Sequence, residues 1–309
     1  MKPPGGSRKP GYFQPRFWPT WVLLGALRSL AQLPFPWQMK LGRLLGWVLY
    51  HGLRRRRLIA ARNIELCLPL LSQAARARLL QRHFYSLGQA LFESASAWWG
   101  PLRRLDLLTR IQGLEHLGAA KAAGRGVIVV SGHFTTIDMC LQIMSRCAPG
   151  YAIYRRNKNP LFNEQTLRAR SRSGGIMFER EDMRTALKAL RDNQSVWFSP
   201  DQDHGLAAHA EFVPFFGIQA ATVTTTARLA ARTGAAVVPL LYRRLPAAGG
   251  YELCLLPALE DYPGEDLRGA TRRINSIIEA QVLLAPEQYL WVHRRFKTRP
   301  PAQPPVYEQ

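Results

Sequence analysis

From residue 126 onward, short apolar segments alternate with longer amphipathic segments, and this alternation constrains the fold more than any other sequence feature. Short apolar runs separated by helical patterns are typical of strands in a parallel sheet. The expected strands cover residues 127–130, 151–154, 176–178, 196–198, 236–242 and 252–256. The expected helices cover residues 136–148, 160–171, 183–192, 222–233 and 266–284. The alternation predicts an α/β fold with a mostly parallel central sheet covered by helices.

His133 and Asp138 follow the first expected strand, in the stretch GVIVVSGHFTTIDMC at 126–140. Ligands of parallel sheets collect beyond the carboxyl ends of the strands, so chemistry is expected here. On one continuous helix, residues five apart are separated by about 140° of rotation. If the helix instead begins near Thr135 or Thr136, the His133 ring can fold back toward the Asp138 carboxylate and keep one nitrogen free as a base. The alternative is a capping histidine beside an unrelated acid.

A second polar loop, within SVWFSPDQDHG at 195–205, follows another expected strand and carries Asp201, Asp203 and His204. A turn with solvated acids is the alternative to a functional site. The spacing does not match a known metal-binding loop, so no metal is expected. The apolar run VPFF at 213–216 fits either the wall of a hydrophobic pocket or ordinary core.

Arginines gather after the expected strand at 151–154. Arg155 and Arg156 follow it directly, and Arg170 lies shortly before a pair of glycines. Guanidinium groups bind phosphates and carboxylates in a bidentate manner. Because both groups flank strand ends on the same predicted side as His133, an anionic ligand is favoured over a merely solvated face.

The chain is strongly basic, with 42 Lys and Arg against 21 Asp and Glu and a net charge of +21. This excess favours a polyanionic partner: nucleic acid, an anionic membrane surface or a phosphorylated substrate. No nucleic-acid reading motif is recognisable, so no nucleic-acid partner is expected. A basic binding protein without enzymatic activity is the remote alternative. The four cysteines form no C-x-x-C pair, which predicts reduced core residues in a cytosol-facing protein.

The segment FWPTWVLLGALRSLAQLPFPW at 17–37 is apolar and has tryptophans near both ends, but Arg28 interrupts it. A spanning helix needs roughly 20 apolar residues, so the segment fits an N-terminal anchor or a helix lying in the membrane interface. A helix packed on the core is the alternative. Four arginines at 54–57 follow a second apolar stretch, which marks a cytoplasmic side and attracts anionic lipid unless the run is simply solvated.

These parts together suggest acyl transfer to a hydroxyl group. A histidine base would deprotonate an alcohol, which attacks a thioester carbonyl directly. No G-x-S-x-G element is present, and the reaction needs no nucleophilic serine or cysteine, no metal and no redox cofactor.

Several motifs resemble the lipid A late acyltransferases, the lauroyl and myristoyl transferases of lipid A biosynthesis, within the wider glycerolipid acyltransferase superfamily. The resemblance runs from about residue 17 to 300. The motifs are RNIELCLP (62–69), FYSLGQALFES (84–94), SGHFTTIDM, YRRNKNPLFNE, FSPDQDHG, FVPFFG and PEQYLWVHRRFKTRP (286–300).

The resemblance implies an acyl-carrier protein as donor and the Kdo-modified lipid IVA precursor, an anionic glycolipid, as acceptor. It implies that His133 is the general base, that Asp138 orients it, and that Arg170 and Asp201 support activity. Many members carry Glu where this chain has Asp138. Alternative acceptors are a lysophospholipid, an ornithine lipid or another glycolipid.

The resemblance also implies an enzyme held at the cytoplasmic face of the bacterial inner membrane by a single N-terminal anchor. We accordingly expect a disordered basic N-terminus (1–16), a membrane-anchoring or interfacial helical segment (17–57), an acyltransferase catalytic domain (58–300) and a C-terminal tail (301–309). The length of the transferred chain is not fixed by the sequence.

Overall fold

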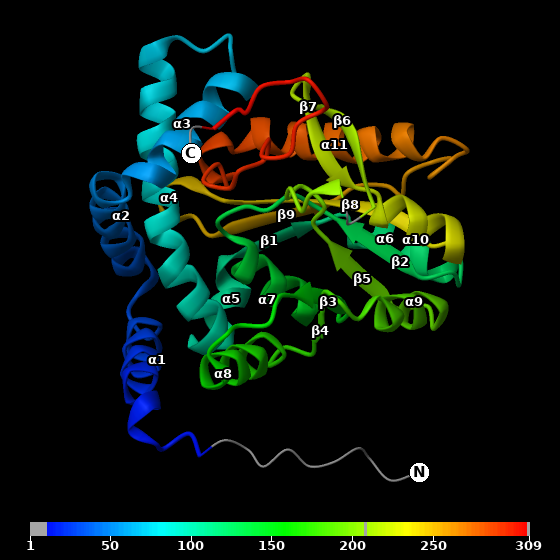
Figure 1. Cartoon of the computed structure of the whole chain (residues 1–309). Coiled ribbons are helices and arrows are strands. Elements are labelled where there is room, and N and C mark those ends of the chain that lie inside the picture. The colour runs from blue at the N-terminus through cyan, green and yellow to red at the C-terminus, as the bar shows by residue number, and fades with distance from the viewer. Residues whose placement is uncertain (1–10, 207–208, 308–309) are drawn as a thin grey trace.

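The computed structural model describes residues 11–206 and 209–307, and its N-terminal helices lie along one side of an α/β unit (Figure 1). These helices are α1 (Trp18–Leu30), α2 (Phe35–Gly52), α3 (Arg54–Cys67), α4 (Gln73–Trp99) and α5 (Leu102–Leu108). The helical character expected for residues 17–57 is therefore confirmed, and helices continue to Leu108. Residues 1–10 of the expected N-terminal segment lie outside the described residues, and the chain begins its regular structure with a 3₁₀ turn at Pro15–Phe17.

Helices α2 and α4 cross at very short range because glycines line both sides of the contact. A Cβ atom on Gly88 would lie 2.1 Å from the Gly42 carbonyl oxygen and 2.3 Å from the Gly46 amide nitrogen. Only a residue without a side chain fits there, because these are backbone atoms that cannot move aside independently. The crossing fixes α2 against α4, which also contacts α7 and α8.

The first two helices each bury one side and expose large apolar residues on the other. Leu24 and Leu27 of α1 are buried, as are Phe35 and Met39 of α2. The exposed apolar residues of the two helices are Trp18, Val22, Leu23, Trp37, Leu44, Trp47 and Val48. Within the described ranges, no helix combines the length and the apolar character needed to cross a bilayer.

The centre of the molecule is a seven-stranded sheet in the order β1-β9-β8-β2-β5-β3-β4. Every neighbouring pair is parallel except β8 and β9. The strands are β1 (Thr109–Gln112), β2 (Val127–Val130), β3 (Tyr151–Tyr154), β4 (Ile176–Glu179), β5 (Ser195–Phe198), β8 (Ala236–Arg244) and β9 (Tyr251–Leu255). The predicted mostly parallel α/β fold is confirmed, and all six expected strands are present.

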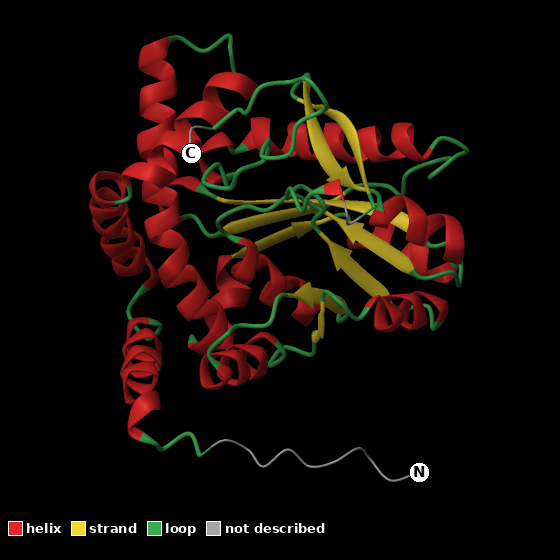
Figure 2. Ribbon diagram, viewed as in Figure 1, coloured by secondary structure: helices red, strands yellow, loops and turns green. Residues whose placement is uncertain are grey.

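Helices cover both faces of this sheet, as Figure 2 shows. The remaining helices are α6 (Leu114–Ala122), α7 (Ile137–Cys147), α8 (Pro160–Arg170), α9 (Met183–Arg191), α10 (Thr225–Thr233) and α11 (Leu267–Leu284). Helix α11 lies on one side of the sheet and α7 on the other (Figure 1). Central strand β2 is completely buried, and its four aliphatic side chains form the middle of the core.

A second, two-stranded sheet was not anticipated from the sequence. Strands β6 (Ala210–Phe215) and β7 (Ile218–Val223) form an antiparallel hairpin that contains the VPFF run and packs on α11. The helix expected at 222–233 begins only at Thr225, because Thr222 and Val223 belong to β7. Val213 and Phe215 are buried, so within this hairpin the run contributes to core packing.

Candidate active site

His133 lies in the loop between the carboxyl end of β2 and the start of α7, where the sequence places it. A residue from the C-terminal part of the chain binds this loop: the Leu290 amide donates to the His133 carbonyl oxygen at 3.0 Å. The Tyr242 hydroxyl donates to the Gly132 carbonyl oxygen at 2.8 Å, and the Gly132 amide donates to Gln281 at 3.2 Å. The backbone of the loop is therefore fixed from β8 and α11.

The acid that contacts the imidazole of His133 is Asp201. Nδ1 of His133 lies 2.6 Å from one carboxylate oxygen of Asp201, and the His133 amide donates to the other oxygen at 2.9 Å. Asp201 follows β5, the strand next to β2, and its side chain is 1% exposed. Two bonds from the same residue fix both the ring and the backbone of His133. A carboxylate on Nδ1 sets the ring tautomer and leaves Nε2 free to act as a base.

The expected contact between His133 and Asp138 is not formed among the described residues, and this expectation is corrected. Because α7 begins at Ile137, Asp138 lies in its first turn and faces α4 and α8. Its carboxylate accepts from Arg170 at 2.9 Å and from the Ser94 hydroxyl at 2.8 Å. Asp138 therefore holds Arg170, whose guanidinium also lies over the Trp98 ring at 5.6 Å. The roles assigned to these residues in catalysis stay predictions.

Ionisation of Asp201 is governed by two opposing effects. Burial favours the neutral acid, but the charge of His133 and the hydrogen bonds from its ring and amide outweigh burial, so the pKa of Asp201 is lowered to about 2. Arg295, itself buried, adds a smaller effect in the same direction. Asp201 is therefore a permanent anion at neutral pH, as a group that orients an imidazole must be.

The alternative of solvated acids in the loop after β5 is wrong, because both aspartates are buried. Asp203 accepts from the Thr298 amide at 2.6 Å and the Thr298 hydroxyl at 2.8 Å. The Asp203 amide donates to His293 Nε2 at 3.1 Å. Burial is the main reason that the pKa of His293 is lowered to about 4, so this acceptor nitrogen is unprotonated at neutral pH. Asp203 thus ties the loop to the C-terminal segment.

His133 opens into a cavity of about 570 Å³. Much of its wall is apolar, and the residues of this kind are Ile137, Leu141, Ala152, Ile153, Met183, Trp197, Phe198 and Val223. Arg155 also lines the cavity, together with Arg180, which the sequence analysis did not select. Arg156 lies outside it, exposed, 3.9 Å from Glu179. The cavity thus combines a polar reactive group, an apolar wall and two guanidinium groups.

Besides Arg180, the residues missed by the sequence analysis come from the last third of the chain, where they support the histidine loop. Tyr242, Gln281 and Leu290 all bond to that loop, from β8, α11 and the following segment. A single sequence gives no signal for such partners, because they lie more than 100 residues away. Among the described residues, no group of three or more His, Cys, Asp or Glu is arranged to hold a metal ion.

Comparison with known proteins identifies the family. Residues 7–298 match the family model described as bacterial lipid A biosynthesis acyltransferase. The chain is 39% identical to the lipid A biosynthesis lauroyltransferase of Escherichia coli (strain K12) over 294 residues, which is 95% of this chain and 96% of that protein. It is 38% identical over 297 residues to the palmitoleoyltransferase of the same organism, covering 96% of each chain.

The myristoyltransferase of lipid A biosynthesis from the same organism is 30% identical over 302 residues, covering 96% of this chain and 92% of that one. These matches extend over nearly the whole length, and the resemblance found in the sequence motifs is confirmed. The chain therefore belongs to the bacterial lipid A biosynthesis acyltransferase family, and it is an acyltransferase of that pathway.

Proposed function

We propose that this enzyme transfers a fatty acyl chain from acyl-carrier protein to a hydroxyl group on an acyl chain of the Kdo-lipid IVA precursor. The observation that carries the proposal is the bond between His133 Nδ1 and the buried Asp201 carboxylate, at one end of a mainly apolar cavity. The names of the relatives, which are lauroyl-, palmitoleoyl- and myristoyltransferases, support a long-chain acyl group as the transferred unit.

In the proposed reaction, Nε2 of His133 accepts the proton of the acceptor hydroxyl as its oxygen attacks the thioester carbonyl. The tetrahedral intermediate then expels the thiolate of the carrier, which receives the proton from the His133 imidazolium. An ester forms, a thioester breaks, and the enzyme returns to its starting state. The protein forms no covalent intermediate and requires no metal or redox cofactor. Asp201 replaces Asp138 as the residue that we propose to orient His133.

Arg155 lines the cavity and is placed to receive an anionic group of a substrate, whereas Arg180 lines it with its guanidinium already 3.2 Å from the Glu181 carboxylate. Arg170 has a different position, because Asp138 already engages its guanidinium. We propose that Arg170 and Asp138 act together to support the beginning of α7. Arg156 is assigned a weaker, peripheral role in attracting the anionic glycolipid.

Membrane attachment is proposed to occur through the exposed apolar residues of α1 and α2, at the cytoplasmic face of the inner membrane. Both helices present tryptophans, which favour the membrane interface, and Arg28 is exposed on α1. A helix lying in the interface accommodates that arginine more easily than a spanning helix does. The basic surface would also favour the approach of an acidic carrier protein.

The test is the His133→Ala variant, assayed with acyl-carrier thioester and the lipid A precursor, with products identified by mass spectrometry. We expect transfer to fall by about 10²-fold to 10⁴-fold, because the general base is lost. The thermal unfolding midpoint should stay close to that of the wild type, since the His133 ring is partly exposed. Retained transfer would remove His133 from the mechanism. Preferred acylation of lysophosphatidate by the wild type would replace the proposed acceptor.

A further inference from the structure

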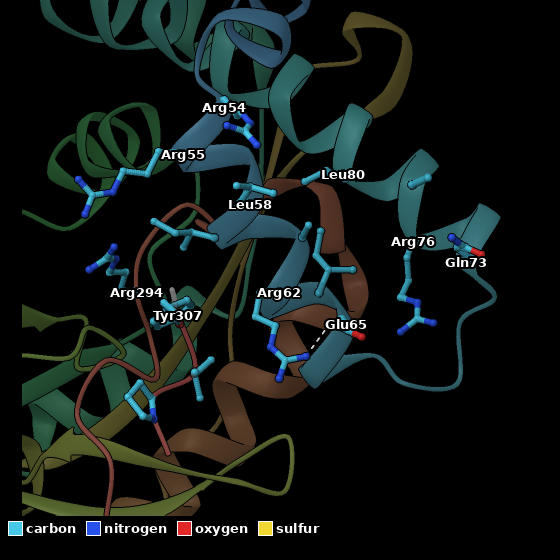
Figure 3. Close-up of a pocket in the computed structure, with 16 residues that line it drawn as sticks. Arg54, Arg55, Leu58, Arg62, Glu65, Gln73, Arg76, Leu80, Arg294 and Tyr307 are labelled. Atoms are coloured by element: carbon cyan, nitrogen blue, oxygen red, sulfur yellow. Dashed lines mark hydrogen bonds and ion pairs between the residues drawn. The ribbon is translucent and has the colours of Figure 1, made fainter. Parts of the chain in front are cut away.

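A second and larger cavity, of about 1440 Å³, lies between α3, the start of α4 and the C-terminal residues 305–307 (Figure 3). It shares no lining residue with the His133 cavity. The Asn63 amide of α3 donates to the carbonyl oxygens of Trp291 and His293, on the segment whose Leu290 holds the His133 loop. That segment therefore lies between α3 and the His133 loop.

The polar part of the wall is dominated by positive charge. The five arginines that line the cavity are Arg54, Arg55, Arg62, Arg76 and Arg294, and Glu65 is the only acid among the lining residues. Glu65 is already bound to Arg62 at 2.8 Å (Figure 3). Within the part of the chain that the structure describes, the other four guanidinium groups have no carboxylate within ion-pair distance. The cavity therefore carries an uncompensated charge of about four.

Arginines mutually repel, so such a group is stable at a surface only where an anion or solvent compensates for it. Guanidinium forks match the geometry of phosphate oxygens better than a compact ammonium does. The five residues come from three separate segments of the chain and surround one concavity (Figure 3). Arg76 of α4 and Arg294 of the C-terminal segment add to the basic run at the start of α3, and together they suit a phosphate-bearing ligand.

The non-polar part of the wall is mainly aliphatic, and exposed apolar residues of α2 precede it along the chain. Leu58, in the cavity, is 54% exposed, and Leu53 just before α3 is 43% exposed. The end of α2 precedes them with Trp47 and Val48, which are each 50% exposed. An apolar surface that leads into an arginine-rich cavity matches an amphiphile, with chains on one side and a charged headgroup on the other.

We propose that this cavity binds the phosphate headgroup of an anionic membrane lipid, at a site separate from the reaction centre. The lipid belongs to the membrane in which the enzyme works and is not a reactant. Arg54 and Arg55 at one end of the cavity and Arg76 at the other would attract phosphate groups, and Leu58 would contact the upper part of the acyl chains. Bound lipid would fix the orientation of α3 on the bilayer. Lipid binding at this cavity is independent of the reaction that the enzyme catalyses.

The test is vesicle sedimentation with full-length protein and two kinds of vesicle: phosphatidylcholine alone, and phosphatidylcholine with phosphatidylglycerol. The cavity variant is Arg54→Gln/Arg55→Gln/Arg76→Gln, which leaves Arg294 in place because its guanidinium packs over the Tyr307 ring. Each arginine near an anionic surface contributes about fivefold to binding, so the partition coefficient should fall by up to about 100-fold on the anionic vesicles. Binding to phosphatidylcholine alone should be unchanged.

The matched control removes the same charge elsewhere, in the variant Arg191→Gln/Arg228→Gln/Arg232→Gln. These arginines are exposed on α9 and α10, on the side of the molecule away from α3 (Figure 1). Salt screens charges beyond about 8–10 Å, so this variant should lose less than about fivefold. An equal loss in the two variants would show diffuse attraction and overturn the proposal.

Unchanged anionic-vesicle binding by the cavity variant would also overturn it. In that case, two further measurements identify the true ligand. Loss of inorganic phosphate binding by calorimetry would assign the cavity to a free anion, and loss of acyl-carrier protein binding would assign it to an acidic protein. Both variants should keep the thermal unfolding midpoint of the wild type, since none of the six side chains makes a hydrogen bond or an ion pair in the described structure.

Discussion

At the scale of single residues, the proposed base His133 and the acid that contacts it, Asp201, come from loops that follow two adjacent strands. His133 is recognisable because it follows a buried strand, where parallel sheets place their ligands. Asp138 is the nearest acid along the chain, whereas Asp201, 68 residues later, is the nearest in space. Adjacency of β2 and β5 in the sheet brings the two loops together, and a single sequence does not reveal strand order. The resemblance named Asp201 without indicating its partner.

This pairing predicts different effects for two substitutions of equal size. Asp201→Asn removes the charge that stabilises the imidazolium and permits the wrong ring tautomer, so kcat should fall by about 10³-fold with little change in KM. Asp138→Asn weakens the support of Arg170 and should lower kcat by less than about tenfold. The pH profile of kcat/KM separates the roles, because only Asp201→Asn should shift its acidic limb. A larger loss for Asp138→Asn would restore Asp138 as the orienting acid.

At the scale of secondary-structure elements, segments with a strong local pattern were predicted well. Strands β2 and β3 have the expected bounds, and helices α7, α8 and α9 differ from theirs by about one residue. The hairpin of β6 and β7 was missed because its second strand, IQAATV, lacks a strong alternation of apolar and polar residues. The short edge strand β1 was missed for a similar reason: its pairing with β9, and not its own residues, makes it a strand.

Three elements line the His133 cavity where it adjoins a second, small cavity, and in the proposed reaction they would limit the length of the acyl chain. Leu141 of α7, Ala152 of β3 and Trp197 of β5 line both this cavity and a small cavity of about 30 Å³ behind it. Ala152 is the smallest of the three, so Ala152→Leu should shorten the accessible depth by about two to three methylene groups. Competition between acyl-carrier proteins bearing different chains should show a shift toward shorter ones.

The matched control is Ala120→Leu on α6, which is also buried but does not line the His133 cavity. Both substitutions add volume to the interior and should destabilise the fold by about 1–3 kcal/mol. Only Ala152→Leu should change chain preference. An unchanged preference would mean that the acyl chain does not enter between these three elements.

At the scale of the whole molecule, the N-terminal helices and the last segment of the chain are joined through buried polar groups of α4. Glu93 is buried and binds Arg244 at 2.8 Å and the Tyr251 hydroxyl at 2.9 Å. His83, also fully buried, donates from Nδ1 to the Glu287 carbonyl oxygen at 3.1 Å. None of these contacts follows from periodicity, which marks α4 only as a long helix. The basic composition favours a polyanionic partner, but it does not show which surface of the protein would bind that partner.

The buried His83 predicts that the whole fold loses stability in mild acid. Burial lowers the pKa of His83 to about 4, with the bond to Glu287 opposing the shift. The unfolded chain, with a histidine pKa of about 6.5, binds the proton first, so protonation favours unfolding. The stabilising contribution of His83 is complete above pH 6.5 and is lost progressively as the pH falls to about 4. The loss of stability at pH 4 amounts to about 3 kcal/mol.

Urea unfolding followed by tryptophan fluorescence at several pH values between these limits measures the effect. His83→Gln keeps an N–H donor for Glu287 but does not titrate, so its midpoint should depend less on pH than that of the wild type. His293 remains in both proteins and, with its pKa lowered to about 4, gives a residual slope of the same sign. Because His83 joins α4 to the segment that holds the His133 loop, the same acid range should also reduce the fraction of active enzyme. Identical pH slopes for the two proteins would show that protonation of His83 does not destabilise the folded state.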